Sequence, residues 1–137
     1  MTPAQTLPTT GPTRTRPVRA IAVAVLGGAV VNAGIFLAFR AAGGTFENTR
    51  TPQPVSVPAV LLLTVVPMLI GLTATALVAR RWPGLVTVGQ VAGPALALLT
   101  IAVPAASGFD TLSLTALALM HVVVAVAVFL GLTALKR

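Results

Sequence analysis

Four long segments without a charged residue constrain this chain more than any other feature. They run over Ala20–Phe39, Val57–Ala79, Val86–Ser107 and Ser113–Leu135 and contain 20, 23, 22 and 23 residues. About 20 apolar residues in an α-helix cross a hydrocarbon core of about 30 Å. The strands of a membrane β-barrel are about 10 residues long and alternate in polarity, which these segments do not. The sequence therefore predicts an all-α membrane protein with four transmembrane helices.

The composition agrees with this prediction. Only 8% of the residues are charged and the mean hydropathy is +0.99, whereas soluble domains are about 25% charged. The chain contains no cysteine, so disulfides, zinc–thiolate sites and iron–sulfur clusters are excluded.

The positions of the basic residues indicate how the spans are oriented. Arg40 and Arg50 fall on one side of the predicted membrane, together with both acids of the chain, Glu47 and Asp110. The other side carries seven basic residues: Arg14, Arg16, Arg19, Arg80, Arg81, Lys136 and Arg137. Because basic residues are retained in cytoplasmic loops, we expect an antiparallel bundle in the plasma membrane with both termini cytoplasmic. The net charge of +7 does not indicate nucleic-acid binding, since the arginines form no basic stripe with stacking aromatics.

The N-terminal region has two interpretations. Residues 1–18 are rich in Thr and Pro and have little to bury, which predicts a disordered cytoplasmic tail before a transmembrane domain over residues 19–137. The first span also resembles a signal peptide, with small residues at Val31-Asn32-Ala33 where a peptidase would cut. Its apolar run continues to Phe39, longer than the about 7–15 residues of a signal core, so we expect the span to be retained.

One polar residue in each span falls at a similar depth. At about 1.5 Å per residue from each span centre, Asn32, Thr64, Thr100 and His121 lie about 3–6 Å to the outer side of the midplane. His121 is the one ionisable side chain well inside a span, and such residues are candidates for function. We expect it to point into the bundle and contact Asn32, Thr64 or Thr100. A role in packing alone explains His121 equally well, because interhelical hydrogen bonds are widespread.

Other residues indicate how the helices begin, break and pack. Asp110 is positioned to cap the N-terminus of the fourth span. Three prolines inside the second and third spans remove backbone hydrogen bonds and predict kinks; they are Pro67, Pro94 and Pro104. In the third span Gly89, Gly93 and Ala97 share one face, which predicts a helix-packing seam.

The segment Ala116-Leu117-Ala118-Leu119-Met120-His121-Val122-Val123, with Asp110 before it and the arginine-rich N-terminal edge, resembles a family of small uncharacterised actinobacterial membrane proteins. These have four helices and carry a domain-of-unknown-function label. The resemblance implies a plasma-membrane location and supplies no activity. The chain has eight arginines and one lysine. This preference for arginine fits a GC-rich genome, as expected for that origin.

Two functions fit these features. The first is a non-enzymatic helical bundle in the lipid bilayer that forms a homo-oligomer or joins a larger membrane complex. It is favoured because the chain has no nucleophile–base set, phosphate loop or metal-ligand constellation, and a lone histidine supplies one metal ligand of the three or four needed. We therefore predict no enzyme activity, no cofactor and no metal. The alternative is a small transporter or channel component that uses the His121 polar cluster.

Overall fold

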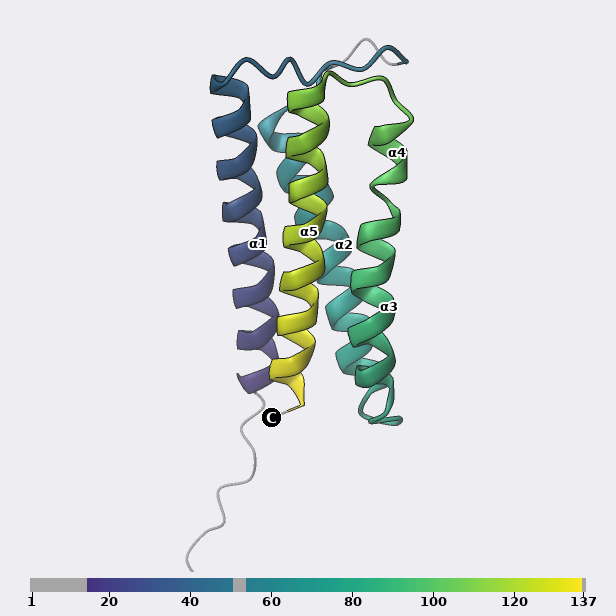
Figure 1. Cartoon of the computed structure of the whole chain (residues 1–137). Helices are drawn as coiled ribbons and strands as arrows, with labels where there is room; N and C mark the ends of the chain where they lie inside the picture. The colour runs from purple at the N-terminus through teal and green to yellow at the C-terminus, as the bar shows by residue number, and fades with distance from the viewer. Residues whose placement is uncertain (1–14, 51–53, 137) are drawn as a thin grey trace, which may run out of the picture.

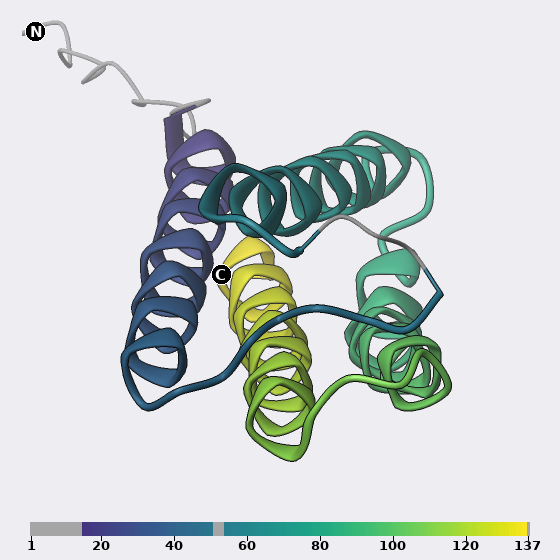
Figure 2. The ribbon, with the colours of Figure 1, turned by 90° about the horizontal axis from the view of Figure 1, so that it is seen from above.

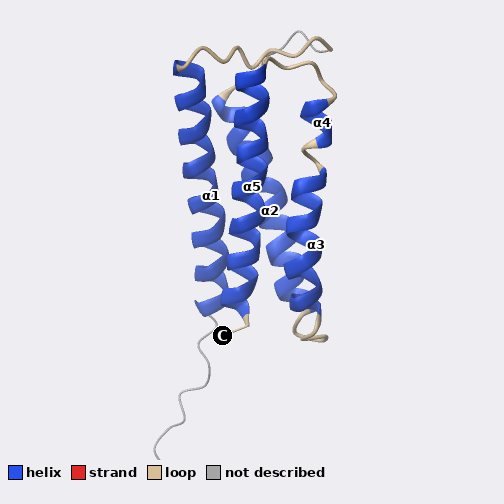
Figure 3. Ribbon diagram, viewed as in Figure 1, coloured by secondary structure: helices blue, strands red, loops and turns tan. Residues whose placement is uncertain are grey.

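The computed structural model describes residues 15–50 and 54–136. All regular elements in this part of the chain are helices (Figure 3). The helices are α1 Thr15–Ala41, α2 Val57–Val78, α3 Leu85–Leu99, α4 Ala102–Ala105 and α5 Thr111–Leu135. Taking α3 and α4 as one stretch, four helical segments are long and apolar enough to cross a membrane. The four predicted spans are thus confirmed as helices of membrane-spanning length and composition.

The first helix starts earlier than the sequence suggested. It begins at Thr15, so residues 15–18, which were expected to belong to a disordered tail, are helical. Pro17 is compatible with this start, because it lies in the first turn, where a backbone N–H has no partner inside the helix. The rest of the expected tail, residues 1–14, lies outside the described residues.

The third span is interrupted rather than continuous. Helix α3 ends at Leu99, and α4 begins at Ala102 after a break at Thr100 and Ile101. Pro104 has no N–H to donate to the carbonyl of Thr100, four residues before it. That carbonyl instead accepts from the amide of Val103 at 3.1 Å, a tighter turn than an α-helix makes. The expected disturbance at Pro104 is therefore a break between two helices.

Helix α5 occupies the middle of the bundle. It packs along α1 on one side and along α3 on the other, while α2 packs mainly on α1 and makes few contacts with α3 (Figure 2). The α1–α2 and α4–α5 connections lie at one end of the bundle and the α2–α3 connection at the opposite end (Figure 1). The described part of the α1–α2 connection that follows α1 crosses over the end of α5 toward α4 (Figure 2).

Small residues let α5 approach its neighbours closely. A Cβ added to Gly131 would lie 3.0 Å from the Cβ of Ala24 in α1, and one added to Gly93 would lie 2.8 Å from Cγ1 of Val128. Two clusters of buried side chains fill the remaining interior. One gathers Ile21, Val25, Met68, Leu72, Val86 and Leu132, and the other gathers Phe36, Phe46, Val60, Ala116 and Met120.

Large apolar side chains cover the outside of all four spans. Val30 of α1, Leu63 of α2 and Val91 of α3 are 72%, 70% and 70% exposed. A soluble monomer rarely exposes contiguous apolar surface on this scale. In a bilayer the same surface faces acyl chains and has no such cost, because lipid tails are as apolar as leucine. The bundle therefore has the surface of a membrane protein.

Candidate functional site

A groove separates α2 from α3 and α4, and α5 forms its floor. Its volume is about 800 Å³, within the range of about 300–1,000 Å³ found for small-molecule sites. The walls are mostly apolar, and none of the described residues that line it carries a charge. All four members of the predicted polar cluster line this groove: Asn32, Thr64, Thr100 and His121.

Asn32 and Thr64 form the one hydrogen bond within that set. Nδ2 of Asn32 donates to Oγ1 of Thr64 over 2.9 Å, and the two side chains are buried with exposed fractions of 1% and 4%. Oδ1 of Asn32 is also buried, and within the described part of the chain it accepts no hydrogen bond. A buried acceptor without a donor is costly and rare in native proteins. Asn32 thus ties α1 to α2, while its own Oδ1 stays buried without a donor among the described residues.

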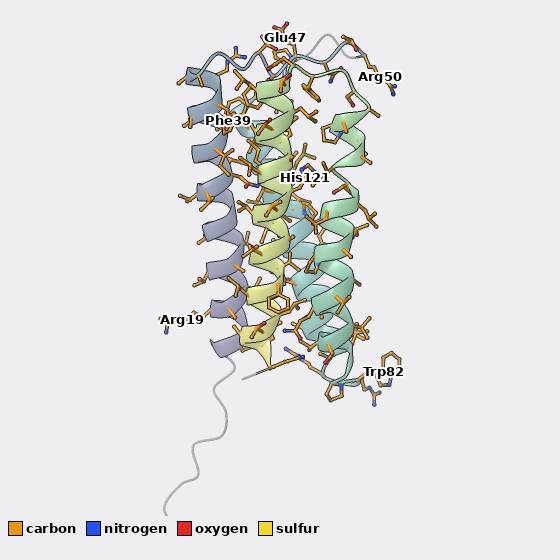
Figure 4. All side chains as sticks on the ribbon, viewed as in Figure 1. Arg19, Phe39, Glu47, Arg50, Trp82 and His121 are labelled. Atoms are coloured by element: carbon orange, nitrogen blue, oxygen red, sulfur yellow. The ribbon has the colours of Figure 1, made fainter. Side chains whose placement is uncertain are left out.

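His121 lies in the space between α5 and α3, and its side chain is half-buried (Figure 4). Its Nδ1 is 2.7 Å from the carbonyl oxygen of Leu117, one turn earlier in α5. Among the described residues, no hydrogen bond joins His121 to Asn32, Thr64 or Thr100. A local carbonyl satisfies one ring nitrogen instead.

Thr100 is also satisfied within its own helix. Its Oγ1 donates to the carbonyl oxygen of Ala97 over 2.7 Å at the end of α3. Such back-bonding is a common way for Thr to satisfy its hydroxyl in a helix. The four predicted residues therefore share one groove, but they do not form one hydrogen-bonded network.

The predicted packing seam lies on the side of α3 that meets α5. Gly93 faces Val128, and a Cβ on Gly89 would lie 3.2 Å from both Cδ1 of Leu132 and Cγ2 of Thr75. Gly89, Gly93 and Ala97 all line the groove as well. The seam therefore lies where α3 meets α5 and also forms part of the groove wall.

A second interhelical hydrogen bond was not expected from the sequence. Nε2 of Gln90 donates to Oγ1 of Thr133 over 2.8 Å and joins α3 to α5. Thr133 in turn donates to the carbonyl oxygen of Phe129 over 2.8 Å. The signal available in the sequence was the depth of Gln90 and Thr133, since both lie near the ends of their spans on the side of the α2–α3 connection.

The opposite end of the bundle is closed by a polar cap, which we define as Thr45, Phe46, Asp110 and Ser113. Asp110 is the N-cap of α5, as predicted, and accepts the amide of Ser113 over 3.0 Å. It also accepts the hydroxyl of Thr45 over 2.7 Å, which joins the α1–α2 connection to α5. Hydrogen bonds from the side chain and amide of Ser113, and then from Thr45, hold the pKa of Asp110 well below its ordinary value of 3.8.

Phe46 anchors the cap in the interior. Its side chain is fully buried, and its ring lies 4.5 Å from that of Phe36, measured between centroids. Its amide donates to Oγ of Ser113 over 2.8 Å, and its carbonyl accepts the amide of Val55 over 2.9 Å. Its φ of 56° lies in the left-handed region, which is strained for a side chain of this size. Packing and two hydrogen bonds offset that strain.

Taken together, the groove offers hydrogen-bonding groups on apolar walls, an arrangement suited to binding. Among residues 15–50 and 54–136, no three His, Cys, Asp or Glu side chains gather as metal ligands would. The four helical segments of membrane-spanning length and composition place the chain among helical membrane proteins. Residues 12–137 match a family of unknown function, DUF6069, and the chain belongs to that family. No curated protein and no solved structure matches the chain.

Proposed function

We propose that this chain is a plasma-membrane protein with an antiparallel four-span bundle and both termini in the cytoplasm. Arg19 and Trp82 lie at one end of the bundle, and Glu47 and Arg50 lie at the other (Figure 4). The end with Arg19 also carries most of the basic residues of the chain, which supports its assignment to the cytoplasm. The family match and the arginine-rich composition are compatible with the actinobacterial origin that the resemblance implies.

We further propose that the bundle is not an enzyme and serves as a subunit of a homo-oligomer or a larger membrane complex. One observation carries this proposal. In the third span, Leu85–Ala105, 6% of the most apolar stretch is buried inside the bundle, against 22–28% in the other three spans. Helix α3 packs mainly on α5, so most of its surface is available to another transmembrane helix.

The proposal is tested by the mass of the assembly extracted from native membranes. The full chain, tagged at its C-terminus and expressed at low level, is extracted in mild detergent and weighed by native mass spectrometry. We expect a complex heavier than the 13.8 kDa chain. A bulky residue on the outer face of α3, Val91→Trp, should dissociate it. The matched variant Val30→Trp on α1 is equally exposed and should leave it intact. A monomer for the unmodified chain contradicts the proposal.

A second function, a small transporter or channel component, is favoured by one specific observation. Four polar side chains from four different helical segments line the same groove: Asn32, Thr64, Thr100 and His121. Polar groups inside a membrane commonly mark a pathway for ions or protons. In proteoliposomes with an internal pH indicator, this function predicts a proton flux that His121→Gln abolishes while assembly stays normal. Glutamine can still form a hydrogen bond, but it cannot take up and release a proton. Equal flux in the two proteins rules this function out.

A further inference from the structure

A second groove lies between α1 and α5. Its volume is about 820 Å³, and all of its described lining comes from these two helices. Val23 and Val126 line it and are 65% and 52% exposed, so the groove is open toward lipid. Ala24 and Gly131 give it depth, because residues this small leave space beside the contact between the helices. We propose that this α1–α5 groove binds an acyl chain of an anionic phospholipid whose phosphate contacts Arg19.

Arg19 determines the charge of the ligand. It is the one charged side chain among the described residues that line the α1–α5 groove, and it forms no hydrogen bond or ion pair with another described residue. A guanidinium group matches the geometry of phosphate oxygens. Both acids of the chain, Glu47 and Asp110, lie at the opposite end of the bundle (Figure 4). A zwitterionic lipid would bring an ammonium group that no acid receives, so the site favours a lipid with a net negative charge.

The length of the α1–α5 groove matches one leaflet of a bilayer. Its lining extends along α1 from Arg19 to Val31 and along α5 from Val122 to Ala134. Each stretch rises by about 18 Å at about 1.5 Å per residue, and half of a hydrocarbon core of about 30 Å is about 15 Å. With Arg19 at the level of the headgroups, the other end of the groove lies near the midplane. An acyl chain of a phospholipid covers this same depth.

A transmembrane helix of a second copy fits the α1–α5 groove less well. Such a helix crosses the whole hydrocarbon core, whereas the groove ends near the middle of α1 and α5. A symmetric pair would also bring a second Arg19 to the same end, where like charges repel. The lipid proposal rests on the membrane location proposed above and is independent of the proposed complex, which involves α3.

Two photoactivatable lipids test the proposal. One is phosphatidylglycerol and the other is phosphatidylcholine, each with the same diazirine-bearing acyl chain. The full chain is reconstituted in nanodiscs of unlabelled phosphatidylcholine with a small fraction of one probe, irradiated, and digested for peptide mapping by mass spectrometry. We expect phosphatidylglycerol to label the groove residues of α1 and α5 about five-fold more than phosphatidylcholine does, the effect of one basic side chain at a membrane surface. Excess unlabelled phosphatidylglycerol should remove the additional label.

Two pairs of variants separate recognition of the phosphate from filling of the groove. Arg19→Gln should bring the ratio of the two labels in the groove close to one. The matched variant Arg81→Gln, exposed at the same end but outside the groove, should retain the preference. Gly27→Leu, inside the groove, should reduce labelling by phosphatidylglycerol, and Gly34→Leu, outside it on the same helix, should not. A Cβ at either glycine meets no atom within 4 Å, so the bundle accommodates both variants.

The outcomes distinguish this proposal from the membrane location on which it rests. Labelling of exposed residues such as Val30 by phosphatidylcholine shows that the bundle lies in lipid. If that labelling occurs and the groove is labelled equally by both probes or by neither, the phospholipid site is wrong and the membrane location stands. The site is also wrong if Arg19→Gln retains the preference, or if Arg81→Gln removes it, because the general positive charge of that end then explains the preference. If neither probe labels any span, both proposals fail.

Discussion

The side-chain amide of Asn32 donates to the hydroxyl of Thr64 over 2.9 Å, inside the bundle and away from both of its ends. The bond joins α1 to α2 between the two clusters of buried apolar side chains. Apolar contacts tolerate a helix sliding along its neighbour, whereas a hydrogen bond between two side chains does not. The pair therefore fixes the register of α1 against α2.

Removing the hydroxyl of this pair should destabilise the bundle. Thr64→Val keeps the shape of the side chain and leaves both ends of a buried amide unpaired, at an expected cost of about 1–2 kcal/mol in the free energy of unfolding. Thermal unfolding of the purified protein in detergent measures the loss. The matched control is Thr115→Val, at an exposed residue whose hydroxyl bonds to Thr111 of its own helix. We expect the control to change stability by less than about 0.5 kcal/mol, and equal effects would show that the pair has no special role.

The close approach of α3 to α5 predicts that replacing Gly93 destabilises the bundle. In Gly93→Ala the new Cβ would lie 2.8 Å from Cγ1 of Val128, and a valine in a helix has little freedom to turn away. We expect a loss of about 1–3 kcal/mol from overpacking.

The control for that prediction is Gly27→Ala in α1, where a Cβ meets no atom within 4 Å. Because alanine is the better helix former, this variant should gain up to about 1 kcal/mol. Both values come from thermal unfolding in the same detergent. If Gly93→Ala leaves the free energy of unfolding unchanged, α3 and α5 lie further apart than they do in this structure.

The polar cap predicts how stability depends on pH. The pKa of Asp110 is lower in the folded state than its ordinary value of 3.8, so the folded state favours the ionised form. The stabilisation is therefore complete above that ordinary value and is lost as the pH falls below it. The contribution of Asp110 to the unfolding temperature should be constant above about pH 5, where its carboxyl is ionised in both the folded and the unfolded protein, and should decrease under more acid conditions.

Two variants test whether Asp110 causes the loss of stability at acid pH. Asp110→Asn should lower the unfolding temperature at neutral pH, because the helix loses a charged cap, and should remove most of the acid sensitivity. Glu47→Gln changes the other acid of the chain and should retain the acid sensitivity. The assignment to Asp110 is wrong if Glu47→Gln removes the acid sensitivity and Asp110→Asn does not.

Much of the fold could be predicted because the constraints are local. The spans follow from uninterrupted apolar runs, and the cap at Asp110 follows from its position before an apolar helix. The common depth of Asn32 and Thr64 was readable because each residue adds a fixed rise. The depth of a residue does not give the rotation of its helix about the helix axis. The sequence therefore could not predict that His121 bonds to the carbonyl of Leu117 and not to a neighbouring helix.

The features that sequence reasoning missed depend on contacts between distant segments. The bond between Gln90 and Thr133 requires α3 and α5 to face each other, which no periodicity encodes. The bond from Thr45 to Asp110 requires the α1–α2 connection to cross the end of α5. The break after Leu99 was expected as a kink at Pro104, but whether a proline bends or interrupts a helix depends on the packing around it.

The central claim, a four-span bundle with cytoplasmic termini, is tested most directly by labelling single cysteines in intact cells. The chain has no native cysteine, so Glu47→Cys and Trp82→Cys each introduce one reactive thiol at opposite ends of the bundle (Figure 4). A membrane-impermeant maleimide should label Glu47→Cys in intact cells and Trp82→Cys only after the membrane is permeabilised. The reverse pattern, or labelling of both variants in intact cells, would contradict the account.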